Sequence, residues 1–183
     1  MHTGDMHSQD PPADRPALEL ARDALRHMLA TLAYRAAKVL RDAPPDFATT
    51  TIGASTRRPV QIVAHLADLM AWGVTLARGD YVWKPQGSND WDDEVRRFFD
   101  GLAALDRAMD APLRSDWMEK LIQGPLADAL THVGQLSMLR GLAGAPVRPE
   151  SYARAEIVIG RVGLEQAPAV REFDGDASVP QPS

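Results

Sequence analysis

The sequence predicts an all-α protein built as a four-helix bundle with short extra helices. Apolar residues recur three and four positions apart over four long stretches, which is the spacing of one face of an α-helix. No stretch shows the alternation of apolar and polar residues, bounded by turn signals, that is typical of strands. Because helices that are apolar on one face must bury that face, four of them are expected to pack together.

The first two helices are predicted over residues 16–41 and 59–79. Pro16 suits the first turn of a helix, and a stretch rich in Pro, Thr, Ser and Gly ends the pattern after about residue 41. The apolar face of the first helix is expected to consist of Leu18, Ala21, Leu25, Leu29, Leu32, Ala36 and Val39. The inner face of the second is expected to consist of Ile62, His65, Leu69, Trp72 and Leu76.

Two further long helices are predicted after the long connection "GDYVWKPQGSND". Ser88 or Asn89 is expected to cap the third, which ends near Met109, and the acidic residues that follow the cap suit the positive end of the helix dipole. The third helix is expected to bury Trp91, Val95, Phe98, Leu102, Leu105 and Met109. A short helical piece capped by Ser115 comes next, and "GP" at 124–125 opens the last long helix, which runs to about residue 144. Its inner face is expected to consist of Ala129, His132, Leu136, Leu139 and Ala143, with Asp128 at the edge of this face.

Composition predicts three parts of unequal order. Residues 1–15 are polar and Pro-rich and are expected to be a disordered tail, residues 16–165 form the bundle, and residues 166–183 form a mostly irregular extension. Residues 150–160 are expected to form one more short helix within the bundle part.

Charge and residue usage exclude several function classes. The chain has 183 residues, a net charge of −5 and no basic stripe, which argues against nucleic acid as a partner. No uncharged apolar run approaches the roughly 18 residues of a membrane span, and the N-terminus does not have the pattern of a secretory signal. There is no cysteine, so a thiolate nucleophile and sulfur metal ligands are excluded. We expect a cytoplasmic protein that binds neither nucleic acid nor membrane.

Three polar residues stand out on apolar helix faces. Asp128 and His132 in "DALTHVGQLSMLR" are four residues apart and must point the same way, and His65 lies at a core position of the second helix. A polar group buried without a partner costs several kcal/mol, so each must have one. They either bond to one another or hold a metal ion, since helix bundles build metal sites from such pairs plus a group on a neighbouring helix. Spacing alone leaves both interpretations open.

Four other residues are expected to play supporting roles. Gln135 is expected either to hold a metal-bound water or the second nitrogen of a ligating histidine, or to form a helix–helix hydrogen bond. Asp68, one turn after His65, is either a carboxylate that orients this histidine or a solvated helix position. Trp72 is expected in the core, and Arg140 at the C-terminal carbonyls of its own helix.

The stretches "IVAHLADLMAW" and "DALTHVGQLSMLRGLAGAPV" resemble the DinB/YfiT-like superfamily of small bacterial helix bundles, over roughly residues 16–165. The most specific parts are a histidine on the second helix with a Trp two turns on, and an H-x-G-Q-[LI] run on the last. The resemblance implies an up-down-down-up bundle, often dimeric, with a divalent metal held by three histidines. His65 and His132 match two of them, and Asp128 stands at the position of the third.

Implied function follows from this altered ligand set. His65, Asp128 and His132 would form a site of two histidines and one carboxylate, for which zinc or nickel is expected first and iron or manganese second. The resemblance implies a homodimeric metal-dependent hydrolase, or a transferase that uses a low-molecular-weight thiol, acting on a small molecule. The alternative is a non-catalytic dimeric helical module whose metal site is degenerate.

Overall fold

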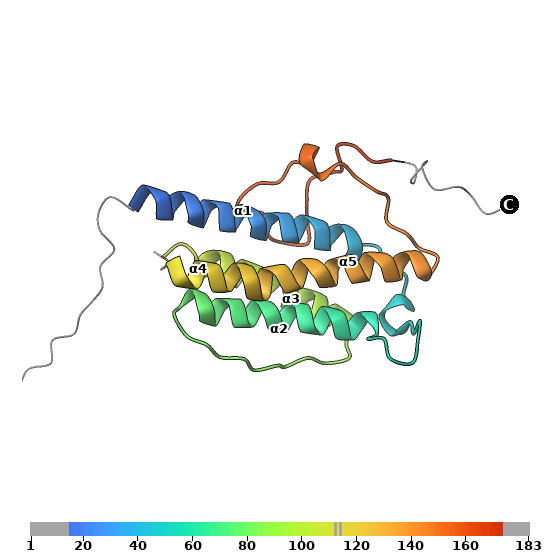
Figure 1. Ribbon diagram of the computed structural model, residues 1–183. Helices are drawn as coiled ribbons and strands as arrows, with labels where there is room; N and C mark the ends of the chain where they lie inside the picture. Colours follow the sequence, from blue (N-terminus) through green and yellow to red (C-terminus); the bar gives the residue numbers. More distant parts are fainter. Residues whose placement is uncertain (1–14, 112, 114, 174–183) are drawn as a thin grey trace, which may run out of the picture.

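Four long helices packed side by side make up the core of the fold (Figure 1). The structure, a computed structural model, describes residues 15–173 except 112 and 114. The long helices are α1 (Arg15–Leu40), α2 (Pro59–Ala77), α3 (Trp91–Ala108) and α5 (Ala127–Leu142), and the short α4 (Ser115–Leu121) precedes α5. Within the described residues the only β-pairing is an isolated bridge between Glu150 and Glu172. The all-α prediction is confirmed.

The long helices begin and end within a few residues of the predicted positions, but the cap of α3 differs. The cap is Asp90, whose carboxylate accepts a hydrogen bond of 2.8 Å from the backbone N–H of Asp93. Ser88 instead accepts from the N–H of Asp90 at 3.2 Å. An Asp directly before the first helical residue is well placed for this bond, so neither Ser88 nor Asn89 is needed as the cap.

The predicted tail, residues 1–15, lies outside the described residues apart from Arg15, which begins α1. The last part of the predicted extension, residues 174–183, also lies outside them. The side chain of Ser115, the predicted cap of the short helix, is likewise outside; the backbone of Ser115 is the first residue of α4.

The second and third helices run in the same direction, and α1 and α5 run opposite to them (Figure 1). Consecutive helices can be parallel only if their connection crosses the full length of the pair. Residues 78–90 do so along the outside of α2. At about 3.3 Å per extended residue this segment is long enough, because a helix rises only about 1.5 Å per residue.

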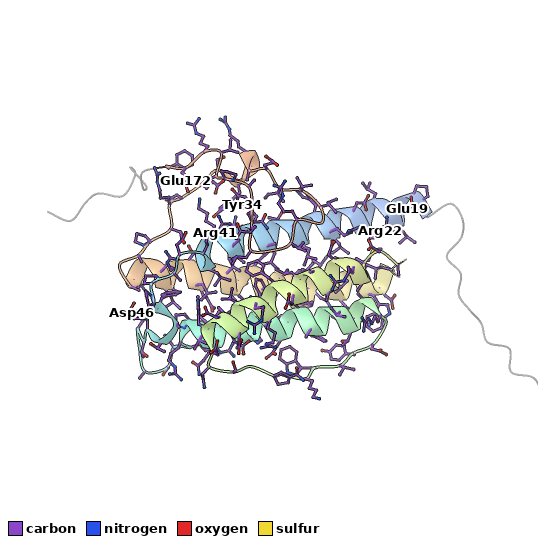
Figure 2. All side chains as sticks on the ribbon, turned by 180° about the vertical axis from the view of Figure 1, so that it is seen from behind. Glu19, Arg22, Tyr34, Arg41, Asp46 and Glu172 are labelled. Carbon is purple, nitrogen blue, oxygen red and sulfur yellow. The ribbon has the colours of Figure 1, made fainter. Side chains whose placement is uncertain are left out.

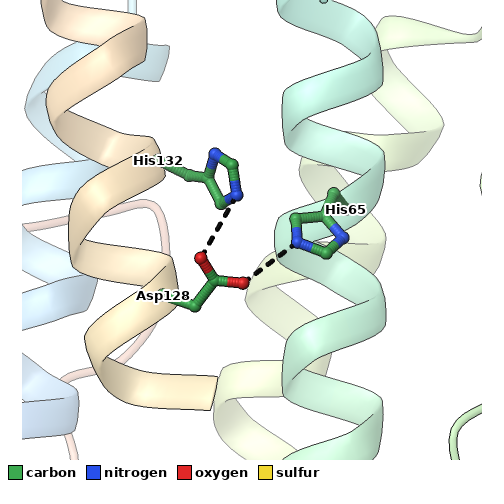
Figure 3. Close-up of side chains that lie close together, drawn as sticks. All are labelled: His65, Asp128 and His132. Carbon is green, nitrogen blue, oxygen red and sulfur yellow. Dashed lines mark hydrogen bonds and ion pairs between the residues drawn. The ribbon is translucent and has the colours of Figure 1, made fainter. Parts of the chain in front are cut away.

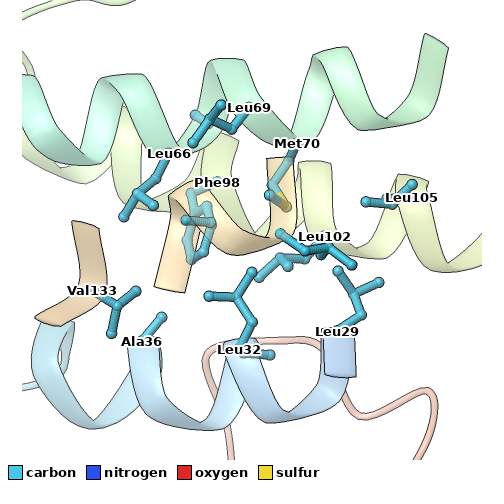
Figure 4. Close-up of a cluster of buried hydrophobic side chains, with 14 of the residues drawn as sticks. Leu29, Leu32, Ala36, Leu66, Leu69, Met70, Phe98, Leu102, Leu105 and Val133 are labelled. Carbon is cyan, nitrogen blue, oxygen red and sulfur yellow. The ribbon is translucent and has the colours of Figure 1, made fainter. Parts of the chain in front are cut away.

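Buried side chains from all four long helices meet in one core (Figure 4). They include Leu29, Leu32 and Ala36 of α1, Leu66, Leu69 and Met70 of α2, Phe98, Leu102 and Leu105 of α3, and Val133 of α5. The predicted stripes are confirmed over most of their length and wrong at two ends, where Ala21 and Ala143 are exposed. Ala143 follows the last residue of α5, so no further turn of helix carries it inward.

The parallel pair α2 and α3 packs closely because small residues line the contact. A Cβ atom added to Gly101 of α3 would lie 2.8 Å from the Cβ of Met70.

The predicted "GP" boundary between the short helix and the last long helix is a kink, not a break between two helices. Ile122–Leu126 form one wide helical turn in which Gly124 has φ −94° and ψ −105°. A side chain at Gly124 would meet the ring of Trp72 at 2.9 Å, so the kink is where α5 approaches α2.

The chain beyond α5 lies along α1 instead of forming another helix (Figure 2). The helix predicted over 150–160 is wrong, because only Tyr152–Arg154 make a single 3₁₀ turn. Tyr34 and Lys38 of α1 both donate to the buried Glu150 at 2.7 Å, and Lys38 also binds Glu172 at 2.6 Å. Burial and the bond to Glu150 raise the pKa of the Tyr34 hydroxyl. The segment is therefore attached to the helices beyond the predicted boundary at residue 165.

Arg140 confirms its predicted role in part. It donates to the carbonyl of Ala145 just beyond its own helix, at 2.9 Å, and also to the carbonyls of Val39 and Arg41 at the end of α1. Burial lowers the pKa of this guanidinium, and nearby Asp42 opposes that effect. One arginine thus satisfies orphan carbonyls at two helix ends.

The helix α2 is long and apolar enough to cross a membrane by length and composition, contrary to the sequence-based expectation. In this fold 61% of its most apolar window is buried inside the protein. Its apolar side chains are buried against the other helices, which is usual for a helix at the centre of a packed helical protein.

Candidate metal centre

His65 lies at the boundary between the core and an open pocket. Its neighbours on the same face of α2, Ile62 and Leu69, are each 2% exposed, whereas the side chain of His65 is 22% exposed. The predicted core position is therefore only partly correct. The imidazole is directed from α2 toward α5 (Figure 3).

Asp128 and His132 lie one turn apart near the start of α5, and both point toward His65 (Figure 3). The His132 side chain is 12% exposed, but that of Asp128 is 45% exposed. Asp128 therefore lies at the edge of the inner face, as predicted, but its carboxylate is not buried as expected. Solvent therefore shares in stabilising its charge.

The three side chains form one compact cluster, which we call the trio. His65 Nε2 lies 3.2 Å from Asp128 Oδ2, and His132 Nε2 lies 3.4 Å from Asp128 Oδ1. The two rings meet edge to face, with centroids 4.8 Å apart and planes at 88°. One donor atom from each residue lies within 4.8 Å of the other two. The prediction that His65 of one helix and Asp128 and His132 of another lie together is confirmed.

Gln135 sets the proton position of His132. Its Oε1 lies 2.8 Å from Nδ1 of the ring, which must carry the hydrogen because an amide oxygen only accepts. In a neutral imidazole the other nitrogen, Nε2, then has a lone pair directed at the Asp128 carboxylate. Of the predicted alternatives, the bond to the second nitrogen of the histidine is the one observed. Two acceptors thus face each other across 3.4 Å, an arrangement that a cation between them would stabilise.

Both predicted interpretations of Asp68 are wrong. Its carboxylate is 7% exposed and binds Nη1 of Arg97 on α3 at 2.6 Å, not His65. The same arginine binds Glu94, which is 1% exposed, at 2.8 Å and the carbonyl of Ala64 at 3.0 Å. Burial alone would lower the pKa of Arg97, but its two carboxylate partners raise it. We call Asp68, Glu94 and Arg97 the buried ion cluster.

The buried ion cluster also holds the crossover segment 78–90 against α2. Backbone N–H groups of Gln86 and Ser88 donate to Asp68 and Glu94. Held in this way, the segment places Trp83 edge-on against His65, with ring centroids 5.8 Å apart. Trp72 contacts the same indole at 5.8 Å. Trp72 thus packs against the core, as predicted, and also contacts the Trp83 ring that lies against His65.

An open pocket of about 600 Å³ adjoins the trio. It is lined by Thr56, Arg57, Ile62, His65, Asp128, His132, Gln135, Met138 and Leu139. Its size lies within the roughly 300–1,000 Å³ of small-molecule sites. The trio is therefore accessible to a small molecule from one side.

The donor set fits a divalent ion. One ligand atom from each residue of the trio lies within 4.8 Å of the other two, and the two imidazole nitrogens lie 3.2 and 3.4 Å from different oxygens of Asp128. Two imidazoles and a carboxylate suit zinc, nickel, iron or manganese. Three protein ligands would leave further coordination positions open for a water or a substrate.

Comparison with known proteins adds no relative: no family model, curated protein or solved structure matches the chain.

Sequence reasoning missed four residues at this site: Thr56, Arg57, Trp83 and Met138. Trp83 was signalled by the apolar triplet "YVW" inside an otherwise polar connection. Arg57 had no such signal, since it sits beside Arg58 in a loop and either could have been solvated. Met138 was off the predicted inner stripe because the pocket lies at the edge of α5.

Proposed function

We propose that the chain is a DinB/YfiT-like metal protein in which His65, Asp128 and His132 hold a divalent ion, zinc or nickel first, and which acts on a small molecule. The observation that carries the proposal is the clustering of the three side chains: His65 Nε2 and His132 Nε2 lie 3.2 and 3.4 Å from the Asp128 carboxylate, and Gln135 Oε1 lies 2.8 Å from the other ring nitrogen of His132. The parallel direction of α2 and α3 supports the up-down-down-up bundle that the resemblance implies.

The proposed activity is hydrolysis or thiol-dependent transfer. A divalent ion held by the trio would act as a Lewis acid, making a water or a low-molecular-weight thiol a better nucleophile near neutral pH. Gln135 would keep Nε2 of His132 free to bind, and Trp83 would limit the movement of His65. The open pocket would admit the substrate to this side of the trio. The protein would need no cysteine of its own.

Zinc titration by calorimetry tests the proposal. The full chain carries His2→Ala and His7→Ala, so that only histidines within the helices remain. We expect one zinc per chain, and a loss of affinity of at least about a hundredfold in His65→Ala. The matched control is His27→Ala, an exposed histidine of α1, which should bind like the parent. Equal affinity in the His65→Ala and His27→Ala proteins would rule out the trio as the site.

One observation favours the alternative, a non-catalytic module: both histidines lie close enough to Asp128 to donate hydrogen bonds to it, at 3.2 and 3.4 Å. If His132 carries protons on both nitrogens, Asp128 accepts from both histidines and the trio satisfies its own hydrogen bonds. In that case the purified protein contains no metal and the titration shows no binding to the parent. Near-stoichiometric metal by elemental analysis contradicts this alternative.

Assembly as a homodimer remains a prediction based on the resemblance. In the sequence, the first and third helices also have broad apolar faces, which could form the interface. Of the large apolar side chains exposed on the described part of the protein, Leu20 and Met28 belong to α1 and none belongs to α3. Light scattering should give twice the mass of the 20.0 kDa chain at micromolar concentration. The mass of a single chain would contradict the prediction.

A further inference from the structure

The pocket beside the trio is lined by one cationic side chain and three large apolar side chains, which we call the apolar wall. Arg57 is the only Lys or Arg among its lining residues, and Ile62, Met138 and Leu139 supply the apolar atoms. Pockets that combine a few placed polar groups with apolar surface are typical of sites for small organic molecules. The nature of these groups indicates which molecule fits.

Arg57 is exposed, and within the described part of the chain no hydrogen bond or ion pair engages its guanidinium. Its backbone, in contrast, is fixed on both sides. The Thr56 hydroxyl donates to the Gly53 carbonyl at 2.8 Å, and the N–H of Arg58 donates to the Gln61 side chain at 2.9 Å. A cation on a held backbone and without a protein partner is available to a ligand.

The chemistry of Arg57 selects an anion. A guanidinium presents a planar pair of N–H donors that matches a carboxylate, with two parallel hydrogen bonds. A divalent ion at the trio would be offset only in part by the single negative charge of Asp128, so the pocket would be positive within a chain of net charge −5. A small anion is attracted to such a site, and a second cation is repelled.

The apolar wall selects the rest of the molecule. Of the apolar residues that line the pocket, Ile62 and Leu139 are 2% and 6% exposed, and Met138 is 61% exposed. Methionine is flexible and adapts its shape to an apolar partner. Covering this wall would remove apolar surface from water, which favours a ligand with a hydrocarbon body over a purely polar one.

We propose that the pocket binds a small carboxylic acid with an apolar body. The carboxylate lies on Arg57, the hydrocarbon part lies along Ile62, Met138 and Leu139, and the remaining end reaches the trio. The inference rests on the proposed function and specifies its substrate class. Arg57 acts in it as a binding residue, separate from the metal ligands.

Calorimetry with hexanoate as the probe tests the proposal on the zinc-loaded full chain. Hexanoate should bind the parent at least about tenfold more tightly than either hexanamide, which lacks the charge, or acetate, which lacks the hydrocarbon body. Arg57→Gln should weaken hexanoate about tenfold and leave zinc affinity unchanged. The matched control is Arg78→Gln, an exposed arginine at the opposite end of α2, which should bind hexanoate like the parent.

Three outcomes separate this inference from the metal proposal. Equal binding of hexanoate by the parent and Arg57→Gln would overturn it, and if zinc removal abolished that binding, the carboxylate would be bound by the ion instead. Equal binding of hexanoate and hexanamide would also overturn it. Arg57-dependent binding of hexanoate to a chain that takes up no zinc would support the pocket and contradict the metal proposal.

Discussion

Two polar residues of α2, His65 and Asp68, are three positions apart but belong to clusters of opposite kinds. In the buried ion cluster, Asp68 and Glu94 are 7% and 1% exposed and share the donors of Arg97. In the trio, Asp128 is 45% exposed, His132 has an acceptor at each ring nitrogen, and an open pocket adjoins all three side chains. What separates the structural cluster from the candidate site is not the kind of residue. It is whether the polar side chains are buried with all their partners or remain open to a pocket.

The largest expected effect is on the buried ion cluster. Arg97→Met would leave two buried carboxylates without their cation, which should lower the free energy of unfolding by about 3 kcal/mol or more. The control is Arg96→Met: Arg96 pairs with Asp93 at the surface, and their side chains are 66% and 57% exposed. Its loss should cost less than about 1 kcal/mol. Urea denaturation of the three proteins measures both, and equal midpoints would remove the distinction between the clusters.

The next effect is on the trio, where binding rather than stability should change. Asp128→Ala should weaken zinc about a hundredfold, which is about 2.7 kcal/mol, because a ligand is lost. The metal-free protein should unfold within about 1 kcal/mol of the parent, since Asp128 is half-exposed. Asp128→His should keep binding because it restores the three-histidine set that the resemblance implies. If Asp128→Ala binds zinc as tightly as the parent, Asp128 is not a ligand.

The smallest effect is expected at Gln135. Gln135→Leu removes the acceptor that holds the ring proton of His132 on Nδ1, and should weaken zinc about tenfold. Gln135→Glu keeps an acceptor oxygen at the same position and should bind at least as tightly as the parent. Calorimetry on both variants tests this. The same loss in both would indicate that Gln135 acts through packing and not through the proton position.

The difference between the two clusters also marks the limit of the sequence analysis. The helices and most of their buried stripes could be predicted, because helical spacing and the positions of Pro and Gly are local signals. The shared direction of Asp128 and His132 is local as well. The partner of Asp68 is not, since Arg97 is on another helix and only the packing of α2 against α3 brings them together.

The kink before α5 could not be predicted from the sequence either. A side chain at Gly124 would meet the ring of Trp72, which belongs to another helix. The path of residues 143–173 along α1 depends on Glu150 and Glu172 meeting Tyr34 and Lys38, more than a hundred residues earlier. Contacts of this separation have no periodic signature in a single sequence.

The contact of Trp83 with His65 gives the protein an optical reporter of its own. An indole whose ring centroid is 5.8 Å from that of a proposed metal ligand lies well within the range at which a paramagnetic ion quenches emission. Nickel at the trio would therefore dim the fluorescence of Trp83, and zinc, which has no unpaired electrons, would not quench it by this route. Occupancy of the site could then be followed in dilute solution without any label, by light emitted from the segment that crosses α2.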